Sequence, residues 1–259
     1  MTFVLPVAKP PMSATHATRP QRLLRFAALG LKWNPYRVPT SGEQRELYVP
    51  LHDLPGCSAL EIARGAARFT QINGESGWGK STLLGAVRDV QFAEEIKYQD
   101  YYLSPEGPFC VKPSAPGVRH LLIDEAQRLS RRGRREIRKW LHIDANRRLI
   151  VTTHDNLDGE FGEPETTIEL RPIDADRLRQ FLVHRVKWAG GDPERFELPL
   201  PTADWLIDRC GHNLRFIEMV LYEFFQSAGP SERIVVELGP LHEFARKAER
   251  FLPAQVRVR

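Results

Sequence analysis

The sequence has few of the residues that build disulfide-rich, zinc-stabilised or membrane-spanning proteins. It contains three cysteines among 259 residues, Cys57, Cys110 and Cys210, which lie far apart and show no CxxC or Cys/His ligand spacing. We therefore expect neither a disulfide framework nor structural zinc, but free thiols in a reducing cytoplasm. No uninterrupted apolar stretch approaches the ~18 residues that span a bilayer, so we expect no membrane partner.

The N-terminal residues also lack the apolar block of a signal peptide, because Pro6 and the Lys9-Pro10-Pro11 run interrupt it. We expect residues 1–20 to form a disordered tail. The formal net charge of +4 and the pI near 9.0 permit nucleic-acid binding without demonstrating it. For nucleic-acid binding, the clustering of positive residues is more informative than the net charge of the chain.

What is present is an alternation of strand-like and helix-like segments. Strand composition appears at residues 68–73, 96–103, 119–126, 147–154 and 166–172, with helical patterns at 79–90 and 130–142. This alternation predicts an α/β three-layer sandwich with a parallel sheet.

The second half of the chain changes to helices alone. Asp174, Thr202 and Asn213 are placed as helix-starting residues, and Gly190, Gly211 and Gly229 as helix stops. We therefore predict an α/β core with an N-terminal arm over residues 21–171, a small helical domain over 172–230, and a C-terminal strand, helix and basic tail over 231–259.

A glycine-rich loop separates the first strand from the first helix of the predicted core. Gly74, Gly79, Lys80 and Ser81 satisfy the pattern G-x-x-x-x-G-K-[ST]. Glycines let backbone N–H groups curl around phosphate oxygens, the lysine neutralises the β- and γ-phosphates, and the serine hydroxyl ligates Mg²⁺. The predicted nucleotide-binding residues are Gly74, Glu75, Ser76, Gly77, Trp78, Gly79, Lys80, Ser81 and Thr82.

Two acidic residues end the apolar run Leu121-Leu122-Ile123. A buried parallel strand would deliver Asp124 to the carboxyl edge of the sheet, where ligands bind in open α/β folds. Asp124 fits the carboxylate that partners the P-loop hydroxyl at Mg²⁺. Glu125 fits a general base for an attacking water, which indicates hydrolysis rather than transfer to a metabolite.

With the P-loop, "LLIDEAQ" (121–127), "LIVTTH" (149–154) and "GHNLRF" (211–216) in this order, the chain resembles the AAA+ ATPases. It is most similar to the bacterial branch of helicase loaders, initiators and transposition-associated ATPases, over residues 25–228. The resemblance implies that residues 21–171 form a P-loop NTPase core and residues 172–230 a helical lid domain. It also implies ATP and Mg²⁺ as cofactors, a homo-oligomer, and a protein partner such as a transposase or helicase.

The same resemblance implies two residues that report the γ-phosphate. A polar "sensor 1" residue falls on the tip of the strand at 149–154, where we name Thr153 and leave Thr152 and His154 as alternatives. A "sensor 2" arginine falls on Arg215, one turn into a lid helix, where it would assist catalysis with Lys80 and Glu125.

A dense run of positive charge follows the acidic pair. Seven cations occur between Arg128 and Lys139, and Glu136 is the one acid within the predicted helix. Like charges at this density repel unless an anion such as a phosphate backbone accompanies them. The residues proposed to contact double-stranded DNA are Arg131, Arg132, Arg134, Arg135, Arg138 and Lys139. An arginine finger acting on a neighbouring subunit, or an ordinary basic surface, remain alternatives.

The leading hypothesis is therefore an ATP-hydrolysing AAA+ switch that assembles on or acts with DNA, in target selection for transposition, replication or repair. A STAND-type signalling ATPase with a protein partner is the second hypothesis. A P-loop kinase is the third, and it is disfavoured by Glu125.

Overall fold

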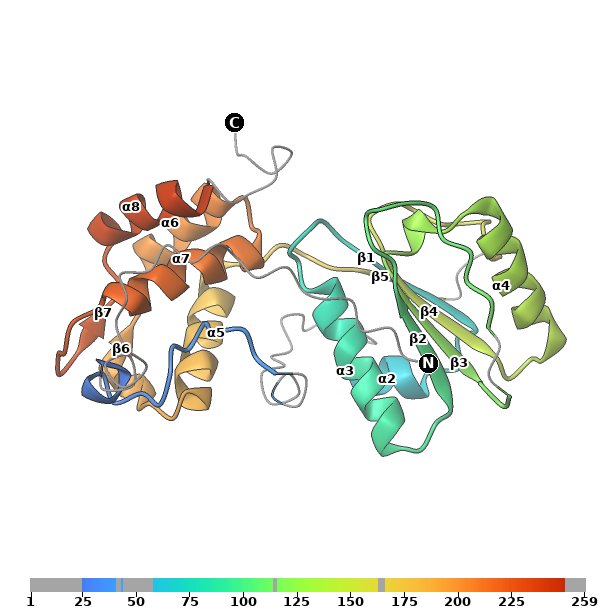
Figure 1. Cartoon of the computed structure of the whole chain (residues 1–259), viewed down its shortest axis with the longest axis horizontal. Helices are drawn as coiled ribbons and strands as arrows, with labels where there is room; N and C mark the ends of the chain where they lie inside the picture. The colour runs from blue at the N-terminus through green and yellow to red at the C-terminus, as the bar shows by residue number, and fades with distance from the viewer. Residues whose placement is uncertain (1–24, 41–42, 44–57, 114–115, 163–165, 250–259) are drawn as a thin grey trace.

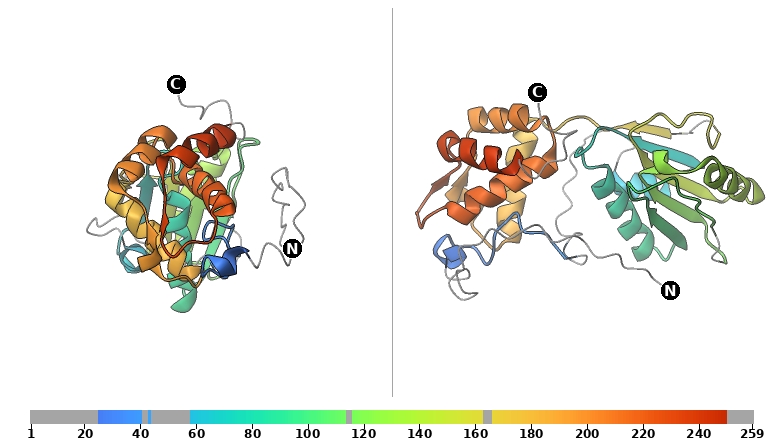
Figure 2. Two further views of the ribbon diagram at one scale, coloured as in Figure 1. Left: turned by 90° about the vertical axis from the view of Figure 1, so that its left-hand side faces the viewer. Right: turned by 45° about the horizontal axis from the view of Figure 1, so that its top comes forward.

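The computed structural model describes residues 25–40, 43, 58–113, 116–162 and 166–249. The disordered tail expected at residues 1–20 and the basic C-terminal tail lie outside the described residues. The described chain forms two units, a P-loop unit (residues 58–171) and a helical unit (residues 25–40 and 172–249), which Figures 1 and 2 show from three directions.

The P-loop unit is built on one five-stranded sheet in which every pairing is parallel. The order across the sheet is β2-β3-β4-β1-β5, so β3, β4 and β1 occupy its centre. Each strand agrees with a stretch predicted from the sequence. The strands are β1 (Phe69–Asn73), β2 (Tyr98–Tyr102), β3 (His120–Asp124), β4 (Arg148–Thr153) and β5 (Thr166–Glu169).

Helices cover both faces of this sheet (Figure 1), so the predicted three-layer α/β architecture is confirmed. Leu121 and Ile123 pack in the cluster beneath α4 (Arg131–Ile143), whereas Leu122 packs with α2 (Ala59–Arg64) and α3 (Lys80–Ala93) on the other face. Successive strand residues point to opposite faces, so a run of apolar residues is what a doubly covered strand requires.

The helical unit has its own apolar core. Its elements are α5 (Ala175–Trp188), η2 (Pro193–Arg195), β6 (Phe196–Glu197), α6 (Leu200–Cys210), α7 (Leu214–Ser227), β7 (Ile234–Val235) and α8 (Leu238–Glu249). Asp174 and Asn213 cap α5 and α7 as predicted, each accepting a backbone N–H bond. Helix α6 begins at Leu200 rather than at Thr202, because Pro201 suits the first helical turn.

The segments at both ends of the described chain belong to the helical unit. The N-terminal arm, expected to accompany the P-loop core, instead buries Phe26, Leu29 and Tyr36 among the helices α5 and α7. At the other end, β7 pairs with β6, and α8 buries Leu241 and Phe244 in the same core. The part of residues 231–259 that the structure describes therefore completes the helical unit.

Candidate functional site

Three neighbouring strands deliver their carboxyl ends to one edge of the sheet. Strand β1 runs into the glycine loop, β3 ends at Asp124, and β4 ends at Thr153. Because the strands are parallel and adjacent, the residues that follow them come together although they are far apart in sequence.

The glycine loop needs backbone conformations that favour glycine. Gly77 and Gly79 have φ angles of 83° and 90°. Gly79 is the N-cap of α3 and provides no side-chain hydrogen bond to it, whereas side chains cap α2, α4, α5 and α7. An uncapped helix N-terminus behind a curled loop is suited to bind an anion, which agrees with the predicted phosphate site. Glu75, Ser76, Ser81 and Thr82 are exposed around it.

Lys80 is buried against its own loop. Its Nζ donates to the carbonyl oxygens of Gly74 (2.7 Å) and Glu75 (3.0 Å) and lies 3.2 Å from Nδ1 of His154. Burial lowers the pKa of the Lys80 ammonium, and the nearby carboxylates of Glu125 and Asp124 oppose that shift. The ammonium is therefore only partly compensated by the protein, as expected of a group that meets phosphate.

Asp124 is oriented by the neighbouring strand. The hydroxyl of Thr152, which is fully buried, donates to Oδ1 of Asp124 and accepts the backbone N–H of Glu125 at 3.0 Å. Thr152 thereby holds the carboxylate at the edge of the sheet. Its role depends on the β3–β4 pairing and is not visible in the sequence.

Glu125 makes contacts through both carboxylate oxygens. Oε2 accepts from Nε2 of Gln127 (2.8 Å) and pairs with Nη2 of Arg128 (3.0 Å), while Oε1 lies 3.4 Å from Nε2 of His154. The Glu125 backbone has a φ of 66°, which an L-residue rarely adopts, so a sharp turn places the two following polar residues back on its side chain. Arg128, which the sequence placed in the basic run, thus belongs to the site through a pairing that the sequence did not reveal.

Of the three polar residues at the end of β4, Thr152 holds Asp124 and His154 reaches Lys80 and Glu125. Its ring lies between Lys80 and Glu125. The hydroxyl of Thr153, which we named from the sequence, instead donates to the Asp155 carbonyl (2.8 Å) and accepts the Asp155 N–H (3.0 Å). Thr153 closes a local turn, so the geometry favours His154 for contact with a bound phosphate.

The helical unit touches the glycine loop at the start of α7. The backbone N–H of Leu214 donates to the Gly77 carbonyl oxygen at 3.2 Å. A side chain at position 77 would meet Oδ1 of Asn213 at 2.3 Å, so the close approach also requires glycine. Arg215 is exposed in the first turn of the same helix. Arg215 therefore follows directly on the two residues that meet the loop, and its role as sensor 2 stays a prediction.

Apart from Arg128, the basic run lies on α4, on the face of the sheet opposite α3 (Figure 1). Its cations differ in their contacts. Arg134 and Arg138 bind the segment at 159–160, and Lys139 pairs with Glu136 at 3.3 Å. Arg131, Arg132 and Arg135 are exposed, and within the described chain they make no hydrogen bond or ion pair.

Comparison with solved structures identifies the fold. Domain III of the replication initiation protein DnaA from Thermotoga maritima aligns with a TM-score of 0.52 at 16% identity, covering 81% of this chain and 98% of that domain. The chain therefore shares its fold with that domain. The resemblance expected from the motif order is confirmed at the level of the fold.

Two more distant structures also align. A point variant of RuvB from Thermotoga maritima has 17% identity and a TM-score of 0.47, over 75% of this chain and 66% of that chain. NtrX from Brucella abortus has 18% identity and a TM-score of 0.49, and the alignment covers 88% of this chain and 60% of the NtrX chain. No protein-family model and no curated protein matches the sequence.

The described residues also bear on membrane insertion and metal binding. No helix among them is long and apolar enough to cross a membrane. They also contain no group of three or more His, Cys, Asp or Glu residues that could hold a metal ion. Mg²⁺ that binds together with a nucleotide usually takes few protein ligands and completes its shell with water and phosphate oxygens.

Proposed function

We propose that this protein is a Mg²⁺-dependent ATPase that works as an AAA+ switch. The observation that carries the proposal is the convergence of Lys80, His154 and Glu125, with 3.2 Å between Lys80 Nζ and His154 Nδ1 and 3.4 Å between His154 Nε2 and Glu125 Oε1. An ammonium, a polar ring and a carboxylate at the mouth of a phosphate-binding loop supply charge neutralisation, positioning and a base for water.

The residues of the site fit ATP and Mg²⁺. The uncapped start of α3 and the loop N–H groups would bind the phosphates, and bound Mg-ATP supplies the phosphoanhydride bond that is hydrolysed. The Ser81 hydroxyl and the Asp124 carboxylate would hold the metal, and Lys80 would neutralise the phosphate charge. Glu125 would take the proton of the attacking water, and Arg215 would report the γ-phosphate to the helical unit.

We further propose that the ATPase acts with double-stranded DNA in the cytoplasm, as a homo-oligomer and with a protein partner such as a transposase or helicase. Exposed Arg131, Arg132 and Arg135, which have no partner within the described chain, support the DNA role, because unpaired guanidinium groups suit phosphate oxygens. The fold shared with domain III of a replication initiation protein is consistent with it.

Two alternatives make different predictions. A STAND-type switch with a protein partner would hydrolyse ATP without a response to DNA. A P-loop kinase would require an acceptor substrate and would not need the carboxylate of Glu125 as a base for water.

The first experiment measures steady-state ATP hydrolysis with and without duplex DNA, using Glu125→Gln as the blank. We expect Lys80→Ala to abolish nucleotide binding, and Glu125→Gln to keep binding while hydrolysis falls by about 10²–10⁴-fold. Normal hydrolysis by Glu125→Gln would contradict the base assignment. Hydrolysis that does not respond to DNA would contradict the DNA role and favour the STAND-type switch with a protein partner.

A further inference from the structure

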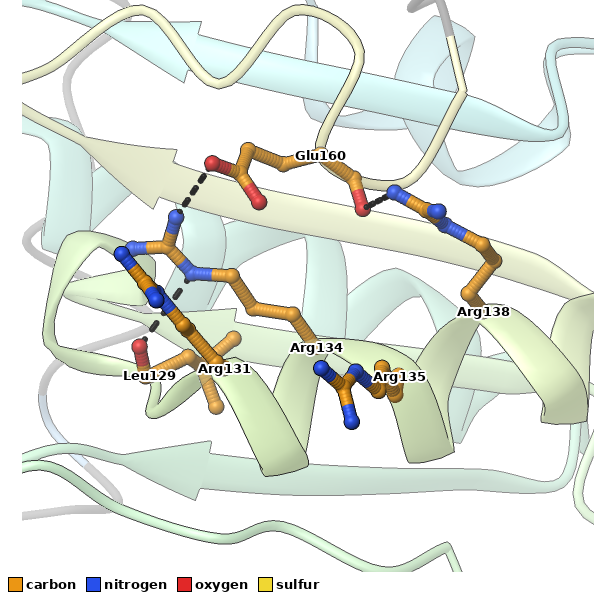
Figure 3. A pocket seen from close by; sticks show the side chains of 6 residues that line it. All are labelled: Leu129, Arg131, Arg134, Arg135, Arg138 and Glu160. Carbon is orange, nitrogen blue, oxygen red and sulfur yellow. Dashed lines mark hydrogen bonds and ion pairs between the residues drawn. The ribbon is translucent and has the colours of Figure 1, made fainter.

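A pocket on α4 lies outside the nucleotide site and is lined mainly by arginines. Its volume is about 430 Å³, and its lining residues are Leu129, Arg131, Arg134, Arg135, Arg138 and Glu160. Four arginines and a single carboxylate therefore line the pocket, and Figure 3 shows Arg134 and Arg138 extending from α4 to Glu160. Such an excess of forked donors is suited to bind phosphate oxygens.

Two of the four arginines are already held by the protein. Arg134 Nη1 pairs with Oε1 of Glu160 at 2.8 Å, and Arg138 Nη2 donates to the carbonyl oxygens of Gly159 (2.9 Å) and Glu160 (2.5 Å). Arg131 and Arg135 are exposed without such partners in the described chain. An anion entering the pocket would meet the free pair first and then compete with Glu160 for Arg134.

Arg134 also holds the turn that carries the general base. Its Nη2 donates to the carbonyl oxygen of Gln127 and its Nε to that of Leu129, both at 3.2 Å. Gln127 and Arg128 in this turn both bind Oε2 of Glu125. One side chain thus lines the arginine pocket and anchors the turn that restrains Glu125.

We propose that the arginine pocket is an effector site for a phosphate group of duplex DNA, and that Arg134 transmits its occupancy to Glu125. The proposal rests on the proposed function, in which Glu125 is the base of ATP hydrolysis. Phosphate in the pocket draws Arg134 away from the Gln127 and Leu129 carbonyls. The contacts of Gln127 and Arg128 with the Glu125 carboxylate then weaken, the carboxylate becomes free to accept the proton of water, and ATP hydrolysis accelerates.

The test measures kcat and KM for ATP with and without a saturating duplex of about 20 base pairs, long enough to offer phosphates over two helical turns, and duplex affinity by fluorescence anisotropy. Wild-type protein is expected to show a kcat several-fold higher with duplex and an ATP KM that changes little. Arg134→Lys keeps the charge but cannot reach both carbonyl oxygens. It is expected to raise kcat without duplex toward the stimulated level and to remove the response, which a merely structural role would not do.

Two further variants keep the test independent of how Arg134→Lys folds. Arg135→Ala is expected to weaken duplex binding roughly tenfold and to lower the salt slope by about one. Glu160→Gln removes the competing carboxylate and is expected to tighten binding several-fold. Arg179→Ala removes an exposed cation on α5 and serves as the matched control, with duplex affinity unchanged.

The outcomes separate this inference from the proposed function. Absence of Glu125-dependent hydrolysis would overturn the ATPase proposal itself. Glu125-dependent hydrolysis that ignores the duplex, or an Arg134→Lys variant stimulated like wild type, would overturn the effector site alone. The same stimulation by inorganic phosphate without duplex would retain the pocket but overturn DNA as its source.

Discussion

His154 and Thr153 are adjacent at the tip of β4, yet their side chains take different partners. His154 lies between Lys80 and Glu125, while Thr153 binds the backbone of Asp155. We expect His154→Ala to lower kcat for ATP roughly 10²-fold, as the loss of a positioned polar group at developing charge does. Thr153→Ala is the matched control, with near-normal kcat and a loss of about 1 kcal/mol in unfolding free energy. If steady-state kinetics instead showed a large loss of kcat in Thr153→Ala and none in His154→Ala, the sensor role would belong to Thr153.

A second residue makes stability depend on pH. His120 is 5% exposed at the start of β3, and Nε2 of Gln91 donates to its Nδ1 at 2.8 Å. Burial, with Arg148 and Arg119 nearby, lowers the pKa of His120 from 6.5 to about 4. The folded-state pKa lies below the unfolded-state value, so on acidification the unfolded chain takes up a proton first and the folded state loses stability.

From neutral pH to about pH 5, this difference should reduce the unfolding free energy by roughly 2 kcal/mol. Urea titrations at the two pH values would measure the loss. His120→Gln removes the titration, so its stability should fall less over the same interval. An equal fall in both proteins would assign the acid sensitivity to other groups.

At the scale of elements, the helical unit contains an ion pair between α5 and α7. Arg185 is buried and pairs with Glu218, and its guanidinium lies 5.0 Å from the Phe181 ring centroid. Nε and Nη1 of Arg185 have no hydrogen-bond partner within the described chain, so Glu218 is the main compensation of this buried charge. We expect Glu218→Ala to cost roughly 3 kcal/mol of unfolding free energy, because it leaves the cation buried and unpaired.

A matched control is the exposed pair between Glu197 and Arg233, with 2.7 Å between Glu197 Oε2 and Arg233 Nη2. Its loss in Glu197→Ala should cost less than about 1 kcal/mol, since solvent screens surface pairs. Chemical denaturation of both variants measures the difference. Equal costs would mean that the α5–α7 pair is not the principal compensation of Arg185.

At the scale of the whole molecule, the loop and α7 meet at one point beside the nucleotide site. The Gly77 carbonyl accepts from Leu214, and Asn213 lies against the Gly77 Cα. We expect Gly77→Ala to separate α7 from the loop, because the new Cβ clashes with Asn213 and φ is positive. ATP affinity should fall by roughly tenfold or more, the equivalent of one lost hydrogen bond, and proteolysis between the units should become insensitive to ATP.

Gly107→Ala is the control for this change, since an added Cβ there meets no atom within 4 Å. Isothermal titration with ATP and limited proteolysis would compare the two variants. Wild-type affinity in Gly77→Ala would show that the two units bind nucleotide without this contact.

Much of the fold and part of the site follow from local sequence patterns. The strands, the caps at Asp174 and Asn213, the glycine loop and the acidic end of β3 depend on residues close in sequence. The placement of Lys80, Ser81, Asp124 and Glu125 at one edge follows from parallel strands. These features were therefore predictable before the structure.

Other features depend on contacts between residues distant in the chain. His154 meets Lys80 because β4 lies beside β1, and Thr153 instead binds the Asp155 backbone. The arm around Tyr36 joins the helical unit through Phe181 and Phe225. By itself the sequence determined which residues are candidates to bind phosphate and metal, since their chemistry and spacing are local. Only the tertiary structure decided which side chains restrain them, because strand order and packing set those distances.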